Sequence, residues 1–272
     1  MIRSFAVAAA AALALAPSPP LAQTVDPALA AIVANADRDP ANRARDPYRH
    51  PEATLSFFGV RPDSVVVEIL PGGNGYWTEI LAPYLKGRGR YIAAIGDRAS
   101  TSKEARDNIA AFEAKFVASP ARYGAIEVAQ FSGGKYAIAA PDSADFVLTF
   151  RNIHNWMAAG EAEAAFAAFY RALKPGGVLG VEEHRGRADA PQDPLAKSGY
   201  VREDFAIALA ESAGFKLAGS SEVNANPNDT KDYAVGVWAL PPTFRLKDVD
   251  REKYAAIGES DRFTLKFVKP PR

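Results

Sequence analysis

Apolar positions in this chain fall into short β-branched runs and longer stretches with helical spacing. The runs predict strands at 64–70, 90–95, 125–131, 145–150, 178–183, 215–223 and 232–240. The longer stretches predict helices at 76–85, 101–117, 161–173 and 202–213. Strand and helix alternate through most of this region, which predicts an α/β fold with a parallel sheet covered by helices on both faces.

The pattern changes at the end of this region. The strands 215–223 and 232–240 have no helix between them, so they can pair antiparallel at one edge of the sheet. The segment that follows is irregular and charged, but residues 262–267 alternate with period two and predict a terminal strand.

The segment before the domain is polar, with alanine-rich pieces that predict short helices at 27–36 and 51–58. It carries a cluster made of Arg43, Arg45, Asp46, Arg49 and His50. Such a cluster favours a solvated arm attached to the domain over an arm that faces a ligand. The predicted organisation is therefore a leader at 1–22, a helical arm at 23–59, an α/β domain at 60–240 and a tail at 241–272.

The first 22 residues have the pattern of a secretory signal peptide. Arg3 precedes an apolar stretch at 5–16, and a proline-rich break ends in the small residue Ala22. The apolar stretch is too short to span a bilayer, so cleavage is favoured over an anchor helix. The expectation is an exported chain, periplasmic or secreted, with no integral membrane segment after cleavage.

The composition excludes several classes of site and makes several classes of function less favourable. The chain has 32 Lys+Arg and 32 Asp+Glu, so no large basic field argues for nucleic acid. It has no cysteine, which excludes disulfides, thiolate metal sites and cysteine nucleophiles. A metal hydrolase would need more than three scattered histidines. The sequence has no Gly-x-Ser-x-Gly elbow, which disfavours an α/β-hydrolase.

Ligands of open parallel sheets bind beyond the carboxyl ends of the strands. Glycine-rich or polar residues follow several predicted strands, and two of the three histidines lie at adjacent strand ends. These histidines are candidates for catalysis or substrate contact. The strand-end candidates are Pro71, Gly72, Gly73, Asn74, Gly75, Asp97, Asn152, His154, Trp156, Glu182, Glu183 and His184.

Three of these segments together resemble a known superfamily. The glycine loop at 71–75, the Asn-Ile-His-Asn-Trp segment at 152–156 and the Leu-Lys-Pro-Gly-Gly turn at 173–177 are similar to class I S-adenosylmethionine-dependent methyltransferases. The chain also resembles the exported "predicted methyltransferase" family of proteobacteria. That likeness extends over roughly 26–270 and includes an Arg-x-x-Asp arm at 43–46 and an aromatic-rich tail at 263–270.

The resemblance implies a Rossmann-like, doubly wound, seven-stranded sheet, mostly parallel with one antiparallel edge strand, for which 232–240 is the expected segment. It also implies S-adenosylmethionine as cofactor. The acid Glu68 would lie near the methionine end of the cofactor, and Asp97 would hold the ribose hydroxyls. The residues expected to contact the cofactor are Glu68, Pro71, Gly72, Gly73, Asn74, Gly75, Asp97 and Asn152.

Methyl transfer needs mainly alignment of the acceptor, with a base where the acceptor carries a proton. His154 is the first candidate base and His184 the second, oriented by Glu182 or Glu183. Trp156 and Tyr200 are expected to contact the substrate, a small molecule methylated on oxygen or nitrogen. No metal ligand set is expected.

One alternative is an exported, non-catalytic binding protein with the same fold. Leu70 stands where the superfamily has glycine, and Ala93-Ala94-Ile95 stands where it has an acid in the second strand. A nicotinamide oxidoreductase is disfavoured, because the glycine spacing differs from the dinucleotide fingerprint and no Tyr-x-x-x-Lys pair follows.

Overall fold

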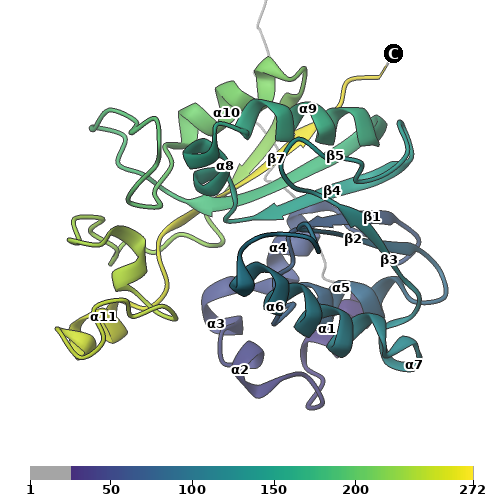
Figure 1. The fold of residues 1–272 in the computed structure, drawn as a ribbon, viewed down its shortest axis with the longest axis horizontal. Helices are drawn as coiled ribbons and strands as arrows, with labels where there is room; N and C mark the ends of the chain where they lie inside the picture. The colour runs from purple at the N-terminus through teal and green to yellow at the C-terminus, as the bar shows by residue number, and fades with distance from the viewer. Residues whose placement is uncertain (1–25, 272) are drawn as a thin grey trace, which may run out of the picture.

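The structure is a computed structural model that describes residues 26–271. The signal peptide expected at 1–22 lies outside the described residues. The described part contains a seven-stranded sheet with the order β3-β2-β1-β4-β5-β7-β6 (Figure 1). The strands are β1 (Val65–Ile69), β2 (Arg90–Ile95), β3 (Ile126–Gln130), β4 (Ala144–Phe150), β5 (Leu173–His184), β6 (Lys216–Ser221) and β7 (Arg262–Val268).

Helices cover both faces of the sheet (Figure 1). One face packs against α1 (Pro27–Val33), α4 (Pro51–Phe58), α5 (Thr78–Leu85) and α6 (Lys103–Phe112), which continues as a π-helical turn at Glu113–Val117. The other face packs against α8 (Ile153–Ala159), α9 (Ala162–Ala172) and α10 (Glu203–Ser212). The shorter helices are α2 (Pro40–Arg43), α3 (Asp46–Arg49), α7 (Pro120–Tyr123), α11 (Arg251–Ile257) and a 3-10 turn at Gly236–Ala239.

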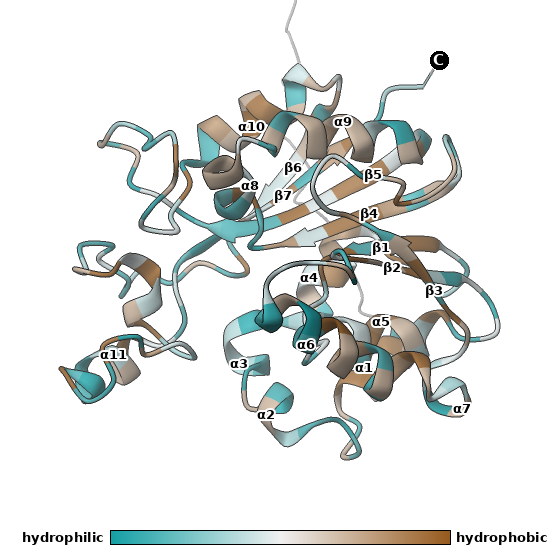
Figure 2. Ribbon diagram, in the orientation of Figure 1, coloured by the Kyte–Doolittle hydropathy of each residue, from teal (hydrophilic) through white to brown (hydrophobic). Residues whose placement is uncertain are grey.

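The central strands are apolar on both sides because both of their faces are covered. In β1, Val66 belongs to one core cluster and the next residue, Val67, to the other. Figure 2 shows the same arrangement as hydrophobic strands between amphipathic helices. Parallel sheets buried on both faces have this continuous apolar pattern. Within residues 26–271, no helix has the length and apolar character needed to cross a membrane.

The predicted seven-stranded, mostly parallel α/β sheet is confirmed, and β2 has the predicted bounds. The prediction of a strand at 232–240 is wrong. Gly236 adopts φ +60°, and the amide of Val237 donates to the carbonyl of Ser198 at 2.9 Å, so this segment forms a 3-10 turn. The antiparallel strand is instead β7, which pairs with β5 on one side and with the edge strand β6 on the other.

The arm packs against the domain along its whole described length. The carboxylate of Asp46 accepts two hydrogen bonds from Arg38, at 2.7 and 3.0 Å, and one from the Tyr76 hydroxyl at 2.7 Å. Asn42 donates to Glu79 of α5 at 3.0 Å, and Arg45 donates to Glu259 at 2.6 Å. The arm therefore forms one wall of the region beyond the carboxyl ends of the strands.

Candidate functional site

The loop after β1 lies between two adjoining cavities. Pro71 and Gly72 line both of them. The first cavity is mainly apolar and is walled by Ile95, Ile109 and Phe112 from β2 and α6. The second is polar and is lined by the rest of the loop, Gly73, Asn74 and Gly75, together with Glu68 and residues of the arm. The loop residues predicted to contact a cofactor are thus placed where a ligand could reach their backbone.

Leu70 begins this loop in an unusual conformation. Its φ is +50°, a region that glycine enters readily and a leucine enters at a cost of about 1 kcal/mol. Its amide donates to the carbonyl of Ala94 in β2 at 2.9 Å, which holds the turn in place. Leu70 therefore adopts a backbone conformation that glycine would enter more easily, and it lines both cavities.

Glu68 is buried at the floor of the second cavity, with 1% of its surface exposed. One carboxylate oxygen accepts hydrogen bonds from the hydroxyls of Thr78 (3.1 Å) and Tyr91. Burial raises the pKa of Glu68 to about 7, while the two hydroxyl hydrogen bonds and the charge of Arg49 act in the opposite direction. The side chain can therefore exist near neutral pH both as an acid and as a carboxylate.

Replacing Glu68 with glutamine is expected to change how stability depends on pH. The folded-state pKa lies above the unfolded value, so the neutral form stabilises the fold below about pH 4.5, and this contribution is lost as pH rises towards 7. Between about pH 4.5 and pH 7 the free energy of unfolding of the wild-type protein should fall by about 3 kcal/mol relative to that of Glu68→Gln. Urea unfolding at several pH values measures the difference.

Glu127→Gln provides the control. The hydrogen bond from Arg90 lowers the pKa of the exposed Glu127 carboxylate, so its contribution is present above about pH 4.5 and changes only below it. If the free energy of unfolding of the wild type and of Glu68→Gln changed in parallel between pH 5 and 8, the raised pKa of Glu68 would be contradicted.

Asn152 and Asp97, two of the predicted cofactor contacts, form hydrogen bonds with neighbouring parts of the protein. The Asn152 amide donates to the carbonyl of Ile69 (3.3 Å) and to the hydroxyl of Thr149 (3.2 Å), so it ties the end of β4 to the end of β1. Asp97 follows β2 and accepts from the amide of Ala99 at 2.8 Å, which stabilises the turn there. Asp97 is adjacent to Gly96 of the first cavity, whereas Asn152 has a bridging role between strands.

The two candidate histidines lie together at the ends of β4 and β5. Their ring centroids are 5.4 Å apart. Nδ1 of His154 is 3.0 Å from the Glu183 carboxylate, which also accepts from the backbone amides of His154 (3.3 Å) and His184 (2.8 Å). Because a carboxylate only accepts, Nδ1 of His154 donates to Glu183, and in the neutral imidazole this leaves the lone pair on Nε2. Glu183 thus orients His154, the geometry expected of a general base.

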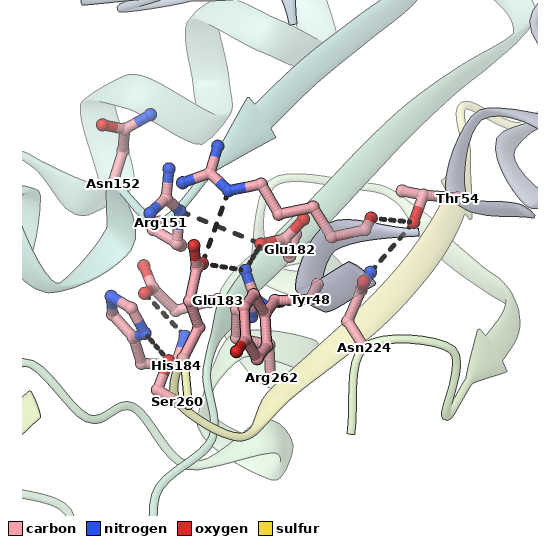
Figure 3. Close-up of polar contacts among 12 residues, drawn as sticks. Tyr48, Thr54, Arg151, Asn152, Glu182, Glu183, His184, Asn224, Ser260 and Arg262 are labelled. Atoms are coloured by element: carbon pink, nitrogen blue, oxygen red, sulfur yellow. Dashed lines mark hydrogen bonds and ion pairs between the residues drawn. The ribbon is translucent and has the colours of Figure 1, made fainter. Parts of the chain in front are cut away.

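His184 has a different environment. Its Nδ1 is 2.6 Å from the Ser260 hydroxyl, and neither Glu182 nor Glu183 contacts its ring nitrogens among the described hydrogen bonds (Figure 3). Burial lowers the pKa of His184 well below its usual value, and the charges of His154 and Arg151 act in the same direction. His184 is therefore neutral at physiological pH.

His154, Glu183 and His184 could each offer a metal-ligand atom, and these atoms lie within 4.8 Å of one another. The surroundings do not favour a cation, because three arginine side chains act electrostatically on this group: Arg49, Arg151 and Arg262. Glu183 is also occupied by three hydrogen bonds. The arrangement suits proton transfer better than metal binding.

The two residues predicted to contact the substrate are placed differently. Trp156 is only 3% exposed and packs among Phe131, Phe166 and Phe169, so the structure places it in the core, and its contact with a substrate stays a prediction. Tyr200 lies beside His184, with ring centroids 6.3 Å apart, and its hydroxyl donates to both oxygens of Asp229. Tyr200 also lines a small cavity with Arg202 and Lys231, so it remains a candidate for substrate contact.

Sequence reasoning missed an arginine cluster that consists of Arg45, Arg49, Arg151 and Arg262. Glu259 is paired with Arg45 (2.6 Å), Arg49 (3.4 Å) and Arg262 (3.2 Å). Glu182 of β5 is paired with Arg262 (3.1 Å) and, more weakly, Arg151 (3.8 Å), as Figure 3 shows. Arg49, expected on a solvated arm, is 1% exposed. The arm residues thus face the cavity.

The sheet order, with β7 reversed between β5 and β6, and the glycine-rich turn after β1 define the fold of S-adenosylmethionine-dependent methyltransferases. A SAM-dependent methyltransferase from Aquifex aeolicus matches with a TM-score of 0.52 and 17% identity, covering 85% of this chain and 94% of that chain. A putative sarcosine dimethylglycine methyltransferase from Galdieria sulphuraria matches with a TM-score of 0.57 and 13% identity, covering 85% of this chain and 88% of that chain.

The [4+2]-cyclase SpnF matches with a TM-score of 0.58 and 15% identity, covering 88% of this chain and 86% of that chain. No protein-family model matches the chain, and no curated protein matches it by sequence. At these identities the likeness concerns the fold, so the activity has to be argued from the site.

Proposed function

We propose that this protein transfers a methyl group from S-adenosylmethionine to a small-molecule acceptor, on oxygen or nitrogen. The observation that carries the proposal is the pair of cavities on the two sides of the loop at 71–75. One is apolar and the other polar and charged. This division matches a ligand that has a planar base at one end and an amino acid at the other.

The residues present fit such a cofactor. Ile95, Ile109 and Phe112 form an apolar wall of the size and character that suits an adenine ring. Glu68 in the second cavity offers a partner for an ammonium group. When bound, the cofactor supplies a methyl group on a sulfonium, which is a good leaving group.

The protein's own contribution is alignment and proton removal. Nε2 of His154 can accept the proton of a hydroxyl or ammonium acceptor, since Glu183 holds the other ring nitrogen in its protonated form. His184, kept neutral by burial, can hold the acceptor by a hydrogen bond without adding charge. Trp238, whose ring lies 6.1 Å from that of His154, and Tyr200, whose ring lies 6.3 Å from that of His184, help to exclude water from the histidine pair.

We also propose that the chain is a member of the exported proteobacterial methyltransferase family that its sequence resembles. A second candidate function is ligand binding without catalysis. It is favoured by Leu70, which replaces the expected glycine, and by the absence of an acid within β2. The two candidates differ in whether the cavities beside the loop hold S-adenosylmethionine, so binding is the first measurement.

Calorimetric titration of the chain from Gln23 onwards with S-adenosylhomocysteine tests whether the cavities beside the loop bind the cofactor. We expect saturable binding in the micromolar range and a rise in melting temperature. Adenosine and free methionine, each representing one half of the ligand, serve as comparisons and should bind far more weakly. Absence of heat and of thermal stabilisation at millimolar S-adenosylhomocysteine would refute the methyltransferase and leave the non-catalytic binding protein.

A further inference from the structure

The arginine cluster carries more positive charge than its acidic partners neutralise. Among the described ion pairs, four guanidinium groups share two carboxylates, those of Glu182 and Glu259. Burying charge without pairing costs several kcal/mol per ion. Arg49 and Arg262 are buried, and the side chains of Arg45 and Arg151 are 21% and 24% exposed. An excess of positive charge in such a largely buried cluster indicates a site that is completed by an anion.

Three arginines of the cluster line the second cavity: Arg45, Arg49 and Arg151. Each has a buried donor nitrogen without a hydrogen-bond partner among the described residues, namely Nη2 of Arg45, Nη2 of Arg49 and Nε of Arg151. Unpaired buried donors of this kind are rare in folded proteins. Here they come from two separate segments, the arm and the end of β4, and they border a single cavity.

Arg49 is the central member. Its side chain is 1% exposed, and its only hydrogen bond among the described residues is a long one, 3.4 Å from Nε to Glu259. The guanidinium also lies over the Tyr76 ring, 4.3 Å from the centroid. Burial lowers the pKa of Arg49 well below its usual value, and the neighbouring charge of Arg151 adds to the effect. These surroundings hold the guanidinium in place but leave one of its nitrogens available.

We propose that Arg45, Arg49 and Arg151 form a binding subsite for an anionic group, a carboxylate or a phosphate, of the molecule that occupies the second cavity. Guanidinium groups match the planar, two-oxygen face of such anions. The inference rests on the proposed function for the source of the anion. It is either the carboxylate of the cofactor's amino acid or an acid group of the acceptor.

The test compares three ligands on four forms of the protein. The ligands are S-adenosylhomocysteine, 5′-methylthioadenosine, which lacks the amino acid, and inorganic phosphate at constant ionic strength. The forms are the wild type, Arg49→Gln, Arg151→Gln and the control Arg61→Gln, whose side chain is 66% exposed on the surface. Arg151→Gln provides an independent variant in case Arg49→Gln does not fold.

Phosphate should raise the melting temperature of the wild type and Arg61→Gln, but not of Arg49→Gln or Arg151→Gln. If the anion belongs to the cofactor, Arg49→Gln should weaken S-adenosylhomocysteine at least tenfold and leave 5′-methylthioadenosine within twofold. If it belongs to the acceptor, S-adenosylhomocysteine affinity should stay constant while the phosphate effect disappears. Both results support the subsite and assign its source.

Two outcomes would overturn the subsite. One is that phosphate stabilises the arginine variants as much as the wild type. The other is that Arg49→Gln lowers the melting temperature without ligand while every ligand response is retained, which would make the residue structural. Failure of both nucleosides to bind the wild type would instead refute the cofactor proposal, and the phosphate response would still decide the subsite.

Discussion

Gly75→Ala is expected to lose about 3 kcal/mol of folding free energy together with binding of S-adenosylhomocysteine. A Cβ at this position would lie 2.3 Å from Cε2 of Phe116, and the backbone has φ +52°, which disfavours alanine. Phe116 is fully buried and contacts the rings of Phe112 and Tyr123, so it has no free space into which to move. The glycine loop must therefore shift, and both cavities change shape.

Gly72→Ala is the matched control in the same loop. Gly72 also has a positive φ, +71°, but a Cβ there would meet nothing within 4 Å. Gly72→Ala should therefore lower the folding free energy only through backbone strain, by about 1 kcal/mol. Thermal and urea unfolding, followed by titration with S-adenosylhomocysteine, separate the two effects. Equal losses for both variants would show that backbone conformation, and not the contact with Phe116, limits this position.

His154→Gln is expected to reduce turnover by roughly 10²- to 10⁴-fold, once an acceptor with a dissociable proton is found, because it removes the proposed base. Binding of S-adenosylhomocysteine should change little, since His154 lies outside both cofactor cavities. Single-turnover methylation with a radiolabelled methyl group measures the rate directly.

His50→Gln is the control for this prediction. His50 is an exposed residue of the arm whose Nδ1 is 3.4 Å from Asn224, and it is not among the described hydrogen-bond or ring contacts of His154 and His184. Its replacement should leave turnover within about twofold. A His154→Gln protein with wild-type turnover at every pH would exclude the residue as the base. An acceptor that reacts without losing a proton would produce this result, and its structure would then identify the reaction class.

Local patterns predicted the centre of the sheet well because they report burial. The β-branched residues of β1 and β2 are covered on both faces, and such runs have few other stable conformations. The segment 232–240 shows the limit of this reasoning. Its alternating residues resemble a strand, but Gly236 packs against Ser198, where a Cβ would lie 2.1 Å from the carbonyl oxygen. That contact depends on a loop 38 positions earlier (236 minus 198), which no local pattern reports.

The site was predictable to the extent that strand ends define it. His154, His184 and the loop residues from Pro71 to Gly75 follow strands, and the parallel topology brings them to one edge. Arg49 was not predictable, because its burial depends on Glu259, which is 210 positions away. Trp156 follows β4 in the same way, yet the short helix α8 places its side chain in the core, because a strand-end position does not fix which way a side chain points.

The position of β7 affects how the molecule assembles during synthesis. This strand is the last of the described sheet along the sequence, yet it lies between β5 and β6 and hydrogen-bonds to both. Ser260 and Arg262, which contact His184 and Glu182, enter with it. Before β7 emerges from the ribosome, β5 has an unpaired edge and the histidine pair lacks one of its walls. We therefore expect the nascent chain to stay open on this side, so that a ligand-binding form exists only after the final strand is inserted.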